Sequence, residues 1–203
     1  MAIKSPIDIT DLTPKYIIKV AGEVLKDHYA LLSINVEHQV NRISAATLSF
    51  ENAPDANGNY IFDDSGDFMR GKRIEIFAGY MLEETISIFS GLITKQNIQI
   101  NSGCGARFDL HCKHEAVKMT FNRKDIDFVS MTDSDVINNI VSANGLIANV
   151  EDSHYTHEAL VQSGATDWDF IVSRAEFNGF LVTLNEKNFV NISKPQLSQE
   201  PSL

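Results

Sequence analysis

The stretch of the chain best equipped for chemistry is His111-Cys112-Lys113-His114, because three of these four side chains are potential zinc ligands. Residues 107–111 alternate between polar and apolar types, which predicts a β-strand that ends here. Successive side chains on a strand point to opposite faces, so His111 and Cys112 should not bind the same ion. No second pair of ligands follows at zinc-finger spacing. We therefore predict no metal site in this stretch.

A second group of ionisable side chains surrounds His154 and His157. Its other members are Glu151, Asp152 and Glu158. Carboxylate and imidazole groups this close in sequence could bind a divalent cation weakly. A short polar segment of this composition is more typical of a solvated surface loop. We predict such a loop here.

Acidic residues also gather in a segment rich in glycine and asparagine. Residues 55–59 resemble the start of a calcium loop, but the glycine falls at loop position four and Gly66 at position twelve. An EF-hand requires glycine at position six and glutamate at position twelve. Asp63, Asp64 and Asp67 could serve as the paired carboxylates of a glycosidase, but no apolar pocket surrounds them to raise one pKa. We predict a turn-rich insertion between strands.

The remaining catalytic motifs are absent from the sequence. It contains no G-x-S-x-G, no P-loop and no G-x-G-x-x-G. Gly103-Cys104-Gly105 closes an expected hairpin and precedes no helix. We therefore predict no catalytic residue, no cofactor and no metal, and a protein that is not an enzyme.

Composition narrows the class of protein further. The chain has 203 residues, 43% of them hydrophobic, which is enough for a real core. Its net charge of −10 argues against a nucleic-acid partner. Neither a spanning apolar segment nor a signal-peptide core is present. Two cysteines, Cys104 and Cys112, are too few for a disulfide framework. They could face each other across a hairpin, but we expect free thiols in a reducing compartment.

The first part of the chain has the period of β-strands. Alternating segments occur at residues 16–20, 30–39, 47–51, 73–80, 85–100 and 107–111. Strict alternation indicates one buried face for each strand, which is typical of an antiparallel barrel or sandwich. Gly91, inside the longest segment, predicts a bulge or bend, and residues 101–103 predict the turn of the last hairpin.

The second part changes to the period of helices. Thr132 and Thr166 each precede an apolar helical stripe and have the residue type of an N-cap, and Asn144 and Asn178, each followed by glycine, end the two helices. Trp168, on the second stripe, is expected in the core. Segments at residues 146–150, 180–184 and 189–192 read as a strand and a hairpin.

These patterns predict two domains in a mainly β (α+β) protein. Residues 1–113 form the antiparallel barrel, residues 114–195 a small α+β domain of helix, strand, helix and hairpin, and residues 196–203 a polar linker to parts beyond this chain. Between the domains, Lys118, Arg123 and Lys124 read as a solvated basic connector, with a contact to an acidic subunit as the alternative.

Several short segments occur in a characteristic order, at residues 69–76, 78–80, 84–91, 89–93, 114–120, 160–162 and 166–170. Together they resemble the N-terminal hub region of VgrG, also called Rhs-element Vgr proteins, of type VI secretion systems and contractile phage tails. The resemblance extends from about residue 15 to residue 195. The resemblance implies a phage baseplate-hub-like barrel in a homotrimeric spike. It also implies that the hub seats on a tail tube of Hcp-like rings.

Members of that family are several times longer, so the resemblance implies that this chain is a fragment or a short hub component. We expect a structural component of a contractile injection apparatus, with baseplate proteins or effectors as partners. It would assemble in the bacterial cytoplasm before translocation, or belong to a virion. An adaptor for an effector or a cell-surface partner is the alternative, and a tail-associated peptidoglycan hydrolase a further one. We expect the isolated chain to be monomeric or weakly associating.

Overall fold

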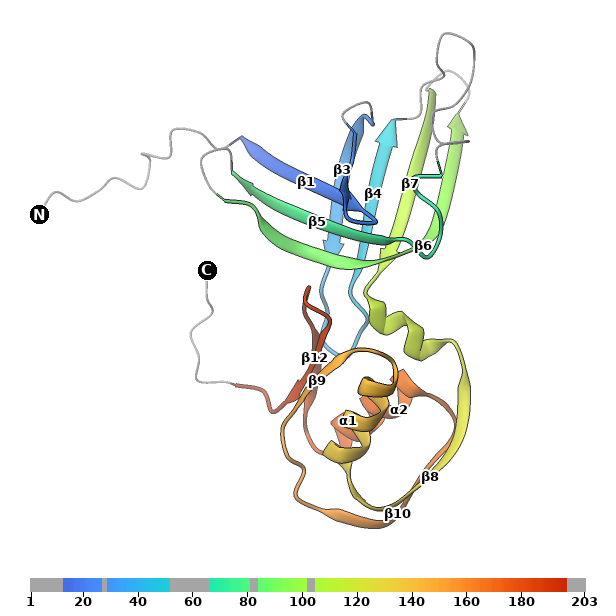
Figure 1. Cartoon of the computed structure of the whole chain (residues 1–203), viewed down its shortest axis with the longest axis vertical. Coiled ribbons are helices and arrows are strands. Elements are labelled where there is room, and N and C mark those ends of the chain that lie inside the picture. Colours follow the sequence, from blue (N-terminus) through green and yellow to red (C-terminus); the bar gives the residue numbers. More distant parts are fainter. Residues whose placement is uncertain (1–12, 27–28, 52–65, 81–83, 102–104, 197–203) are drawn as a thin grey trace, which may run out of the picture. The chain divides into compact units, whose positions relative to one another are not determined.

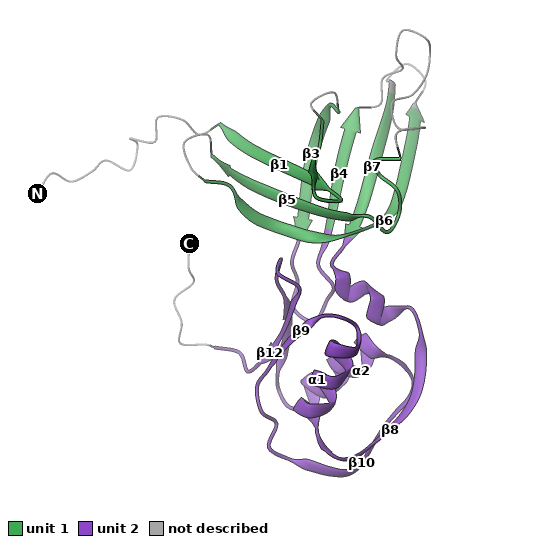
Figure 2. Ribbon diagram, viewed as in Figure 1, with its two compact units in different colours: residues 1–36, 46–112 green, residues 37–45, 113–203 purple. Residues whose placement is uncertain are grey.

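The computed structural model describes residues 13–26, 29–51, 66–80, 84–101 and 105–196. The chain divides into two compact units (Figure 2). Unit 1 comprises residues 1–36 and 46–112, and unit 2 comprises residues 37–45 and 113–203. Residues 37–45, here called the excursion, thus belong to unit 2 although the residues on both sides of them belong to unit 1. The sequence gives no obvious signal for this segment. Residues 52–65, with the resemblance to a calcium loop, and the turn at 102–104 lie outside the described residues.

Unit 1 is built on one seven-stranded sheet in the order β2-β1-β5-β6-β7-β4-β3. Its strands are β1 (Pro14–Val20), β2 (Glu23–Val24), β3 (Leu31–Glu37), β4 (Ala45–Glu51), β5 (Arg73–Tyr80), β6 (Ile86–Asn101) and β7 (Gly105–Lys113). The mainly β, antiparallel character expected from the sequence is confirmed. The expected closed barrel is not: among the described residues the sheet stays open, with β2 and β3 as its edges.

Alternation along the strands supplies the core of unit 1. The sheet curves until β1 and β5 lie across β4 and β7, with the long β6 bending between them (Figure 1). Its inward side chains include Leu48, Ile74, Ile76 and Leu110, each 0% exposed. Phe68 also joins this core, in an aromatic group with Tyr29, Phe50 and Phe108 whose ring centroids lie 5.0–6.3 Å apart. Tilted and edge-on ring pairs at these distances stabilise a core beyond simple burial.

β6 contains the irregularity predicted from Gly91, but it lies at Ile88, three residues earlier. The ladder pairs on either side of the shift are Ile76 with Phe89 and Phe77 with Ser87. Ile88 is therefore the extra residue of a β-bulge, whereas Gly91 pairs regularly with Ile74. Ile88 is partly buried against the core of unit 1. The bulge is consequently made by an apolar residue, which glycine-based reasoning could not identify.

Unit 2 combines two α-helices with short strands. Its elements are η1 (Glu115–Thr120), β8 (Arg123–Thr132), α1 (Asp133–Ala143), β9 (Ile147–Val150), β10 (Thr156–Thr166), α2 (Asp167–Phe177), β11 (Leu181–Leu184) and β12 (Phe189–Ser193). β12 pairs antiparallel with β11, the expected hairpin, and parallel with β9. β8 and β10 form a separate antiparallel ribbon, which passes around the helix pair (Figure 1).

The ribbon and the sheet enclose the helices in a second core. Val136, Ile137 and Val141 of α1 and Ile171 and Ala175 of α2 are 0–1% exposed. Phe128 of β8 and Leu160 of β10 pack on the same cluster from outside. Trp168 belongs to this core, as expected, at 7% exposure. Unit 2 thus has a hydrophobic core of its own.

The basic connector expected between the domains is ordered structure. Lys118 lies in η1 and forms an ion pair with Glu115 at 2.7 Å. Arg123 and Lys124 begin β8, where Lys124 Nζ lies 2.6 Å from the buried carboxylate of Asp167. The expectation of a solvated linker was therefore wrong for this segment.

The two helix caps predicted from sequence are confirmed. Thr132 Oγ1 accepts a hydrogen bond from the Asp135 backbone at 3.1 Å, and Thr166 Oγ1 accepts one from Asp169 at 3.1 Å. Each threonine also donates to the carboxylate of its acidic partner, at 2.8 Å. Each threonine hydroxyl thus contacts both the backbone and the side chain of the third residue of its helix.

We predict that Thr132→Ala and Thr166→Ala will each lower the free energy of unfolding by about 1 kcal/mol, because each removes a satisfied N-cap. Urea unfolding followed by far-UV circular dichroism measures this. Thr183→Ala, at an exposed position on β11, serves as the control. Cap variants no less stable than the control would show that the hydroxyl groups contribute nothing.

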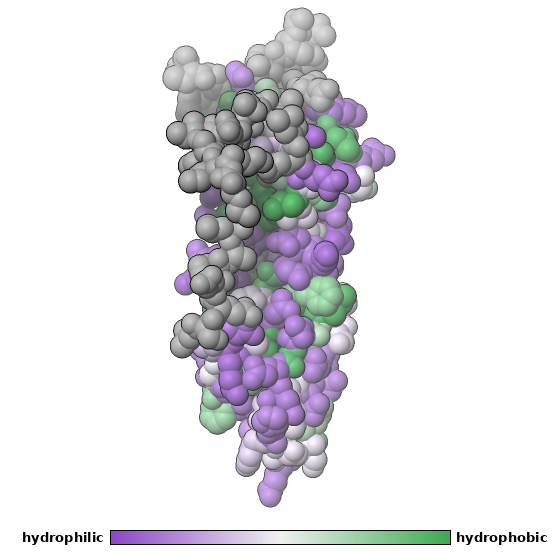
Figure 3. Space-filling view, turned by 90° about the vertical axis from the view of Figure 1, so that its left-hand side faces the viewer, coloured by the Kyte–Doolittle hydropathy of each residue, from purple (hydrophilic) through white to green (hydrophobic). Residues whose placement is uncertain are grey.

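Exposed apolar side chains are dispersed on the face shown in Figure 3, where they occur as small patches between hydrophilic residues. Within the described residues, no helix has both the length and the hydrophobicity that a membrane span requires. An adaptor would be expected to expose an apolar patch on its helix pair. Among the large apolar side chains of α1 and α2, only Phe177 is strongly exposed, at 72%, and Arg174 covers one side of its ring.

Candidate functional site

The potential zinc ligands of residues 111–114 do not face a common site. Cys112 faces the core of unit 1, is 1% exposed, and has its pKa raised to about 12 by burial. His111 faces the other way, with its Nδ1 atom 3.3 Å from the hydroxyl of Thr47. A thiol protonated at neutral pH is a poor metal ligand and a poor nucleophile. Across the described residues, no three His, Cys, Asp or Glu side chains converge as a metal site would require.

His114 has a structural role that explains its burial. Its Nδ1 atom accepts a hydrogen bond from the backbone of Ala116 at 3.1 Å and so caps η1. Its Nε2 atom donates to the carbonyl of Asn185 at 3.0 Å. This pattern requires the neutral imidazole, and burial lowers the pKa of the ring accordingly.

The two histidines of the expected polar loop occupy different environments. His154 lies in the loop beside Asp152, with both side chains exposed. His157 lies on β10, is largely buried, and hydrogen-bonds to Asp133 at 3.0 Å. The prediction of a solvated loop therefore fails for His157, because β10 carries it inward toward the first residue of α1.

Asp133 is the centre of a buried polar cluster in unit 2. Its carboxylate accepts two hydrogen bonds from Arg174, at 2.6 and 3.0 Å, one from Asn178 at 2.9 Å and one from His157. Burial would raise the pKa of this carboxyl, but the hydrogen bonds outweigh it and lower the pKa to about 2. The cluster ties α1, α2 and β10 together. With every acceptor position in use, Asp133 is poorly placed to act as a catalytic base.

A second buried carboxylate lies in unit 1, where the sequence had suggested no site. Asp109 accepts hydrogen bonds from Ser49 at 2.6 Å and from Arg107 at 2.7 Å. Arg107 also donates to the Ser49 hydroxyl at 2.7 Å. A serine activated for nucleophilic attack needs a base as its neighbour. Here the neighbour of Ser49 is Asp109. Burial would raise the pKa of Asp109, but the hydrogen bonds from Ser49 and Arg107 lower it, so it is a weak base. The group is better described as a cross-strand link between β4 and β7.

Asp67, the described member of the acidic loop, is held by Tyr29 and Lys26. The Tyr29 hydroxyl donates to it at 2.7 Å and Lys26 lies 3.7 Å away. The hydrogen bond from Tyr29 lowers the pKa of Asp67, and Lys26 acts in the same direction. This carboxyl is therefore ionised at neutral pH and lacks the raised pKa of a glycosidase acid. Asp63 and Asp64 lie outside the described residues.

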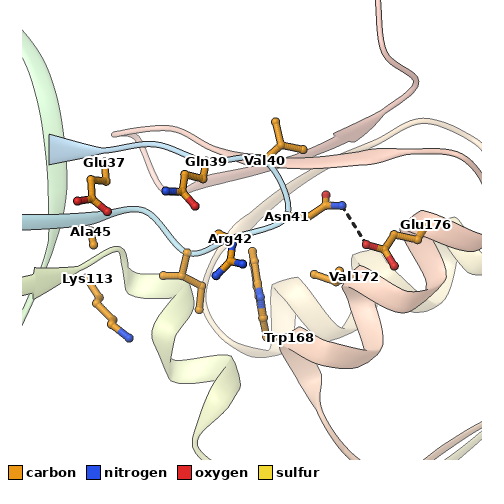
Figure 4. Close-up of a pocket in the computed structure, with 11 residues that line it drawn as sticks. Glu37, Gln39, Val40, Asn41, Arg42, Ala45, Lys113, Trp168, Val172 and Glu176 are labelled. Carbon is orange, nitrogen blue, oxygen red and sulfur yellow. Dashed lines mark hydrogen bonds between the residues drawn. The ribbon is translucent and has the colours of Figure 1, made fainter.

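Unit 2 contains a pocket of about 650 Å³ (Figure 4). Ile43, Trp168 and Val172 are apolar members of a lining that is otherwise mostly polar. The other lining residues are Glu37, Gln39, Val40, Asn41, Arg42, Ala45, Lys113 and Glu176. Three separate segments therefore build it: the excursion 37–45, the end of β7, and α2.

Asn41 fixes the wall of this pocket. Its backbone N–H donates to the carbonyl of Val182 at 2.9 Å, and its side-chain oxygen accepts from the Val182 N–H at 2.9 Å. Its amide group donates to Glu176 at 3.1 Å (Figure 4). Asn41 has a φ of 59°, a left-handed conformation that asparagine tolerates better than most residues. The excursion is thus bonded to β11 and α2, and the pocket is preformed.

Unit 1 also contains a recess, an apolar groove of about 670 Å³. It runs between the beginning of β1 and β3, where the sheet is open. Tyr16, Leu32, Tyr80 and Ile86 line it and are 47–68% exposed. Tyr16 and Tyr80 share the strand parity of the buried Ile18 and Ile76, so they are core-facing positions left uncovered where the sheet does not close.

Solved structures that match this fold include proteins of phage tails and of a secretion system. The 43 kDa tail protein of prophage MuSo2 from Shewanella oneidensis superposes with a TM-score of 0.70 at 11% identity, over 91% of this chain and 54% of that one. The E. coli c3393 protein, described as a type VI secretion component similar to the T4 tail proteins gp27 and gp5, gives 0.67 at 15% identity, over 91% and 50%. A chain of the Francisella PdpA-VgrG complex gives 0.61 at 11% identity, over 92% and 32%.

These likenesses define the class: the fold is that of phage tail and type VI secretion hub-like proteins. This chain spans about half the length of the first two structures and about a third of the length of the third. By sequence, the chain belongs to the family described as the Alg8 N-terminal domain, whose model matches residues 10–203. The family shown is therefore not that of VgrG, and the resemblance to VgrG is one of fold. No curated protein matches the sequence.

Proposed function

We propose that this chain is a structural component of a contractile injection apparatus, either a phage-like tail or a type VI secretion system. The observation that carries the proposal is the extent of the structural match. It covers 91% of this chain, and so reaches both units, in two proteins described as a tail protein and a secretion component. A match limited to one domain would support a shared function less strongly, because a single fold occurs in proteins of many functions.

Within such an apparatus we propose the role of a hub that seats on the tail tube. The groove of unit 1 supports a role in assembly, because core-facing side chains left exposed mark an interaction surface. The buried carboxylates support a non-enzymatic role, since Asp133 and Asp109 are committed to hydrogen bonds within the fold. The solved complex of VgrG with PdpA supports a further protein partner.

The direct test is assembly with the tail-tube protein of the same source. We expect the purified chain, or a longer polypeptide that carries it, to co-sediment with tube rings, and its loss to leave particles without an attached hub in electron micrographs. A chain that binds neither tube nor baseplate proteins but gains lytic activity on peptidoglycan would overturn the proposal in favour of an enzyme.

The oligomeric state gives a separate prediction. A closed ring of head-to-tail contacts needs two complementary surfaces on each barrel-like unit. The described residues form one such sheet. Association must also offset several kcal/mol of lost rigid-body freedom, about 4 kcal/mol or more. We expect the 203-residue chain to be monomeric or weakly associating at micromolar concentration. Sedimentation equilibrium measures this, and a tight trimer would show that these residues carry the trimer contacts.

A further inference from the structure

The second half of unit 2 repeats the elements of the first. β8, α1 and β9 are followed by β10, α2 and β11, and the bounds of α1 and β9 recur in α2 and β11 at a constant separation of 34 positions. Residues separated in this way are here called twins. Six of the nineteen residues from 132 to 150 are identical to their twins, namely Thr132, Asp133, Asp135, Ile137, Asn144 and Gly145.

The backbone follows the same repeat. Both helices end at an asparagine followed by a left-handed glycine, with φ of 75° at Gly145 and 70° at Gly179. Ser130 is also left-handed, with a φ of 53°, which is uncommon for a residue with a side chain. Its twin is Gly164, with a φ of 57°. β8 and β10 therefore share an unusual backbone conformation at the same place in the repeat.

The contacts between the two helices are reciprocal. The side-chain amide of Asn178, at the end of α2, donates to Asp133, the first residue of α1, at 2.9 Å. The amide of Asn144, at the end of α1, donates to Asp167, the first residue of α2, also at 2.9 Å. The helices lie against each other inside the ribbon (Figure 1). Contacts in which two residues meet, and their twins meet in the same way, indicate a twofold axis between the halves.

The strands obey the same axis. In the ribbon, Asp127 pairs with its own twin, Val161, so the axis passes through this pair. β9 and β11 lie on opposite sides of β12, one parallel and the other antiparallel to it. They therefore run in opposite directions, as strands related by this axis must. β12 and the excursion lie outside the repeat.

We propose that unit 2 is a pseudo-dimer, in which two copies of one β-α-β half, residues 123–150 and 157–184, join through a self-complementary interface. The surface between the halves has the isologous form of a twofold homodimer, so the partner that each half fits is a second copy of itself. The proposal rests on unit 2 alone and holds whether or not the chain belongs to a tail.

The two buried aspartates receive their counter-charge from different elements. Asp167 pairs with Lys124, on a strand, at 2.6 Å. Asp133 pairs with Arg174, on a helix, at 2.6 Å. The twin of Arg174 is Ile140, which has no charge to offer Asp167. If the halves are equivalent, the cation of either site can come from the strand or from the helix.

The place of Lys124 in the first half corresponds to that of His157 in the second. Lys124 lies opposite Ala165 in the ribbon, and His157 lies opposite Met131, the twin of Ala165. Each also contacts the buried aspartate that begins the neighbouring helix. A lysine at position 157 should therefore reach the carboxylate of Asp133.

Transplanting the lysine tests the equivalence in the 203-residue chain. Arg174→Ile should lower the urea midpoint of unit 2, because it leaves a buried carboxylate without its cation. Addition of His157→Lys should recover at least about half of that loss, through coupling to Asp133. The matched control is Glu158→Lys in the same background, since Glu158 is the exposed neighbour on β10, and it should recover none. If Arg174→Ile unfolds unit 2 without urea, recovery of the folded circular dichroism signal is compared instead.

The reciprocal asparagines provide a milder pair of variants. Asn144 and Asn178 each donate to a carbonyl of their own helix and to the aspartate of the other helix. Asn144→Ala and Asn178→Ala should therefore lower the urea midpoint by amounts that agree within about twofold. Asn139→Ala, at an exposed position of α1, should leave the midpoint unchanged.

The proposal fails if His157→Lys recovers nothing, or if Glu158→Lys recovers as much. It also fails if one of the two asparagine variants behaves like the Asn139→Ala control while the other is clearly destabilised. None of these results bears on whether the chain joins a tail, which the tube assay decides separately.

Discussion

Asp133→Ala should lower the free energy of unfolding of unit 2 by about 3–5 kcal/mol, because it leaves the largely buried guanidinium of Arg174 without its partner. Asn178 and His157 lose an acceptor at the same time. Trp168 fluorescence follows the unfolding of this unit in urea, since the chain has no other tryptophan. Asp127→Ala is the matched control, because Asp127 lies on β8 of the same unit but is exposed.

The same carboxylate should give stability a dependence on acid. Its pKa is about 2 in the folded chain against 3.8 for an ordinary aspartate. The folded-state pKa is the lower one, so the stabilisation is complete above pH 3.8 and is lost as the pH falls through about 2. Its full size is about 2 kcal/mol. Asp133→Asn should lack this component, and a variant with an unchanged acid profile would contradict the cluster.

Trp168→Ala is the second substitution expected to have a large effect. The indole is 7% exposed in the core of unit 2, and removal of a large aromatic side chain from a core costs about 3–5 kcal/mol. Unfolding in urea must here be followed by far-UV circular dichroism, because the fluorophore is lost. Trp168→Phe, which keeps a ring in place, is the control and should cost clearly less. A near-neutral alanine variant would mean that the indole serves the pocket and not the core.

Local signals in the sequence predicted the local features. Thr132 and Thr166 were identified as caps because a cap depends only on residues within one helical turn. The strands of unit 1 were predicted because strict alternation needs no knowledge of the partner strand. The end of α1 at Asn144 and of α2 at Asn178 follows from the same short-range chemistry.

Features that depend on distant partners were missed. β8 carries charged residues among its apolar ones, so its segment read as a connector until β10, more than thirty residues later, paired with it. His157 could be assigned to the interior only through that pairing, which brings it to Asp133. The pocket was likewise hidden, because Arg42 and Trp168 come from segments about 126 positions apart in the chain. The one weak indication of the pocket wall in the sequence was Asn41, because asparagine tolerates the left-handed conformation that this residue adopts.

Because of the bulge at Ile88, the effect of deleting one residue from β6 depends on where in the strand the deletion falls. Deleting a residue from a regular stretch would send every following side chain to the wrong face of the sheet. Removing Ile88 would instead leave Ser87 next to Phe89 and restore an unbroken ladder with β5. Ile86 and Phe89 would keep the faces they have now. Among descendants of this gene, variation in the length of β6 should therefore concentrate at this one position.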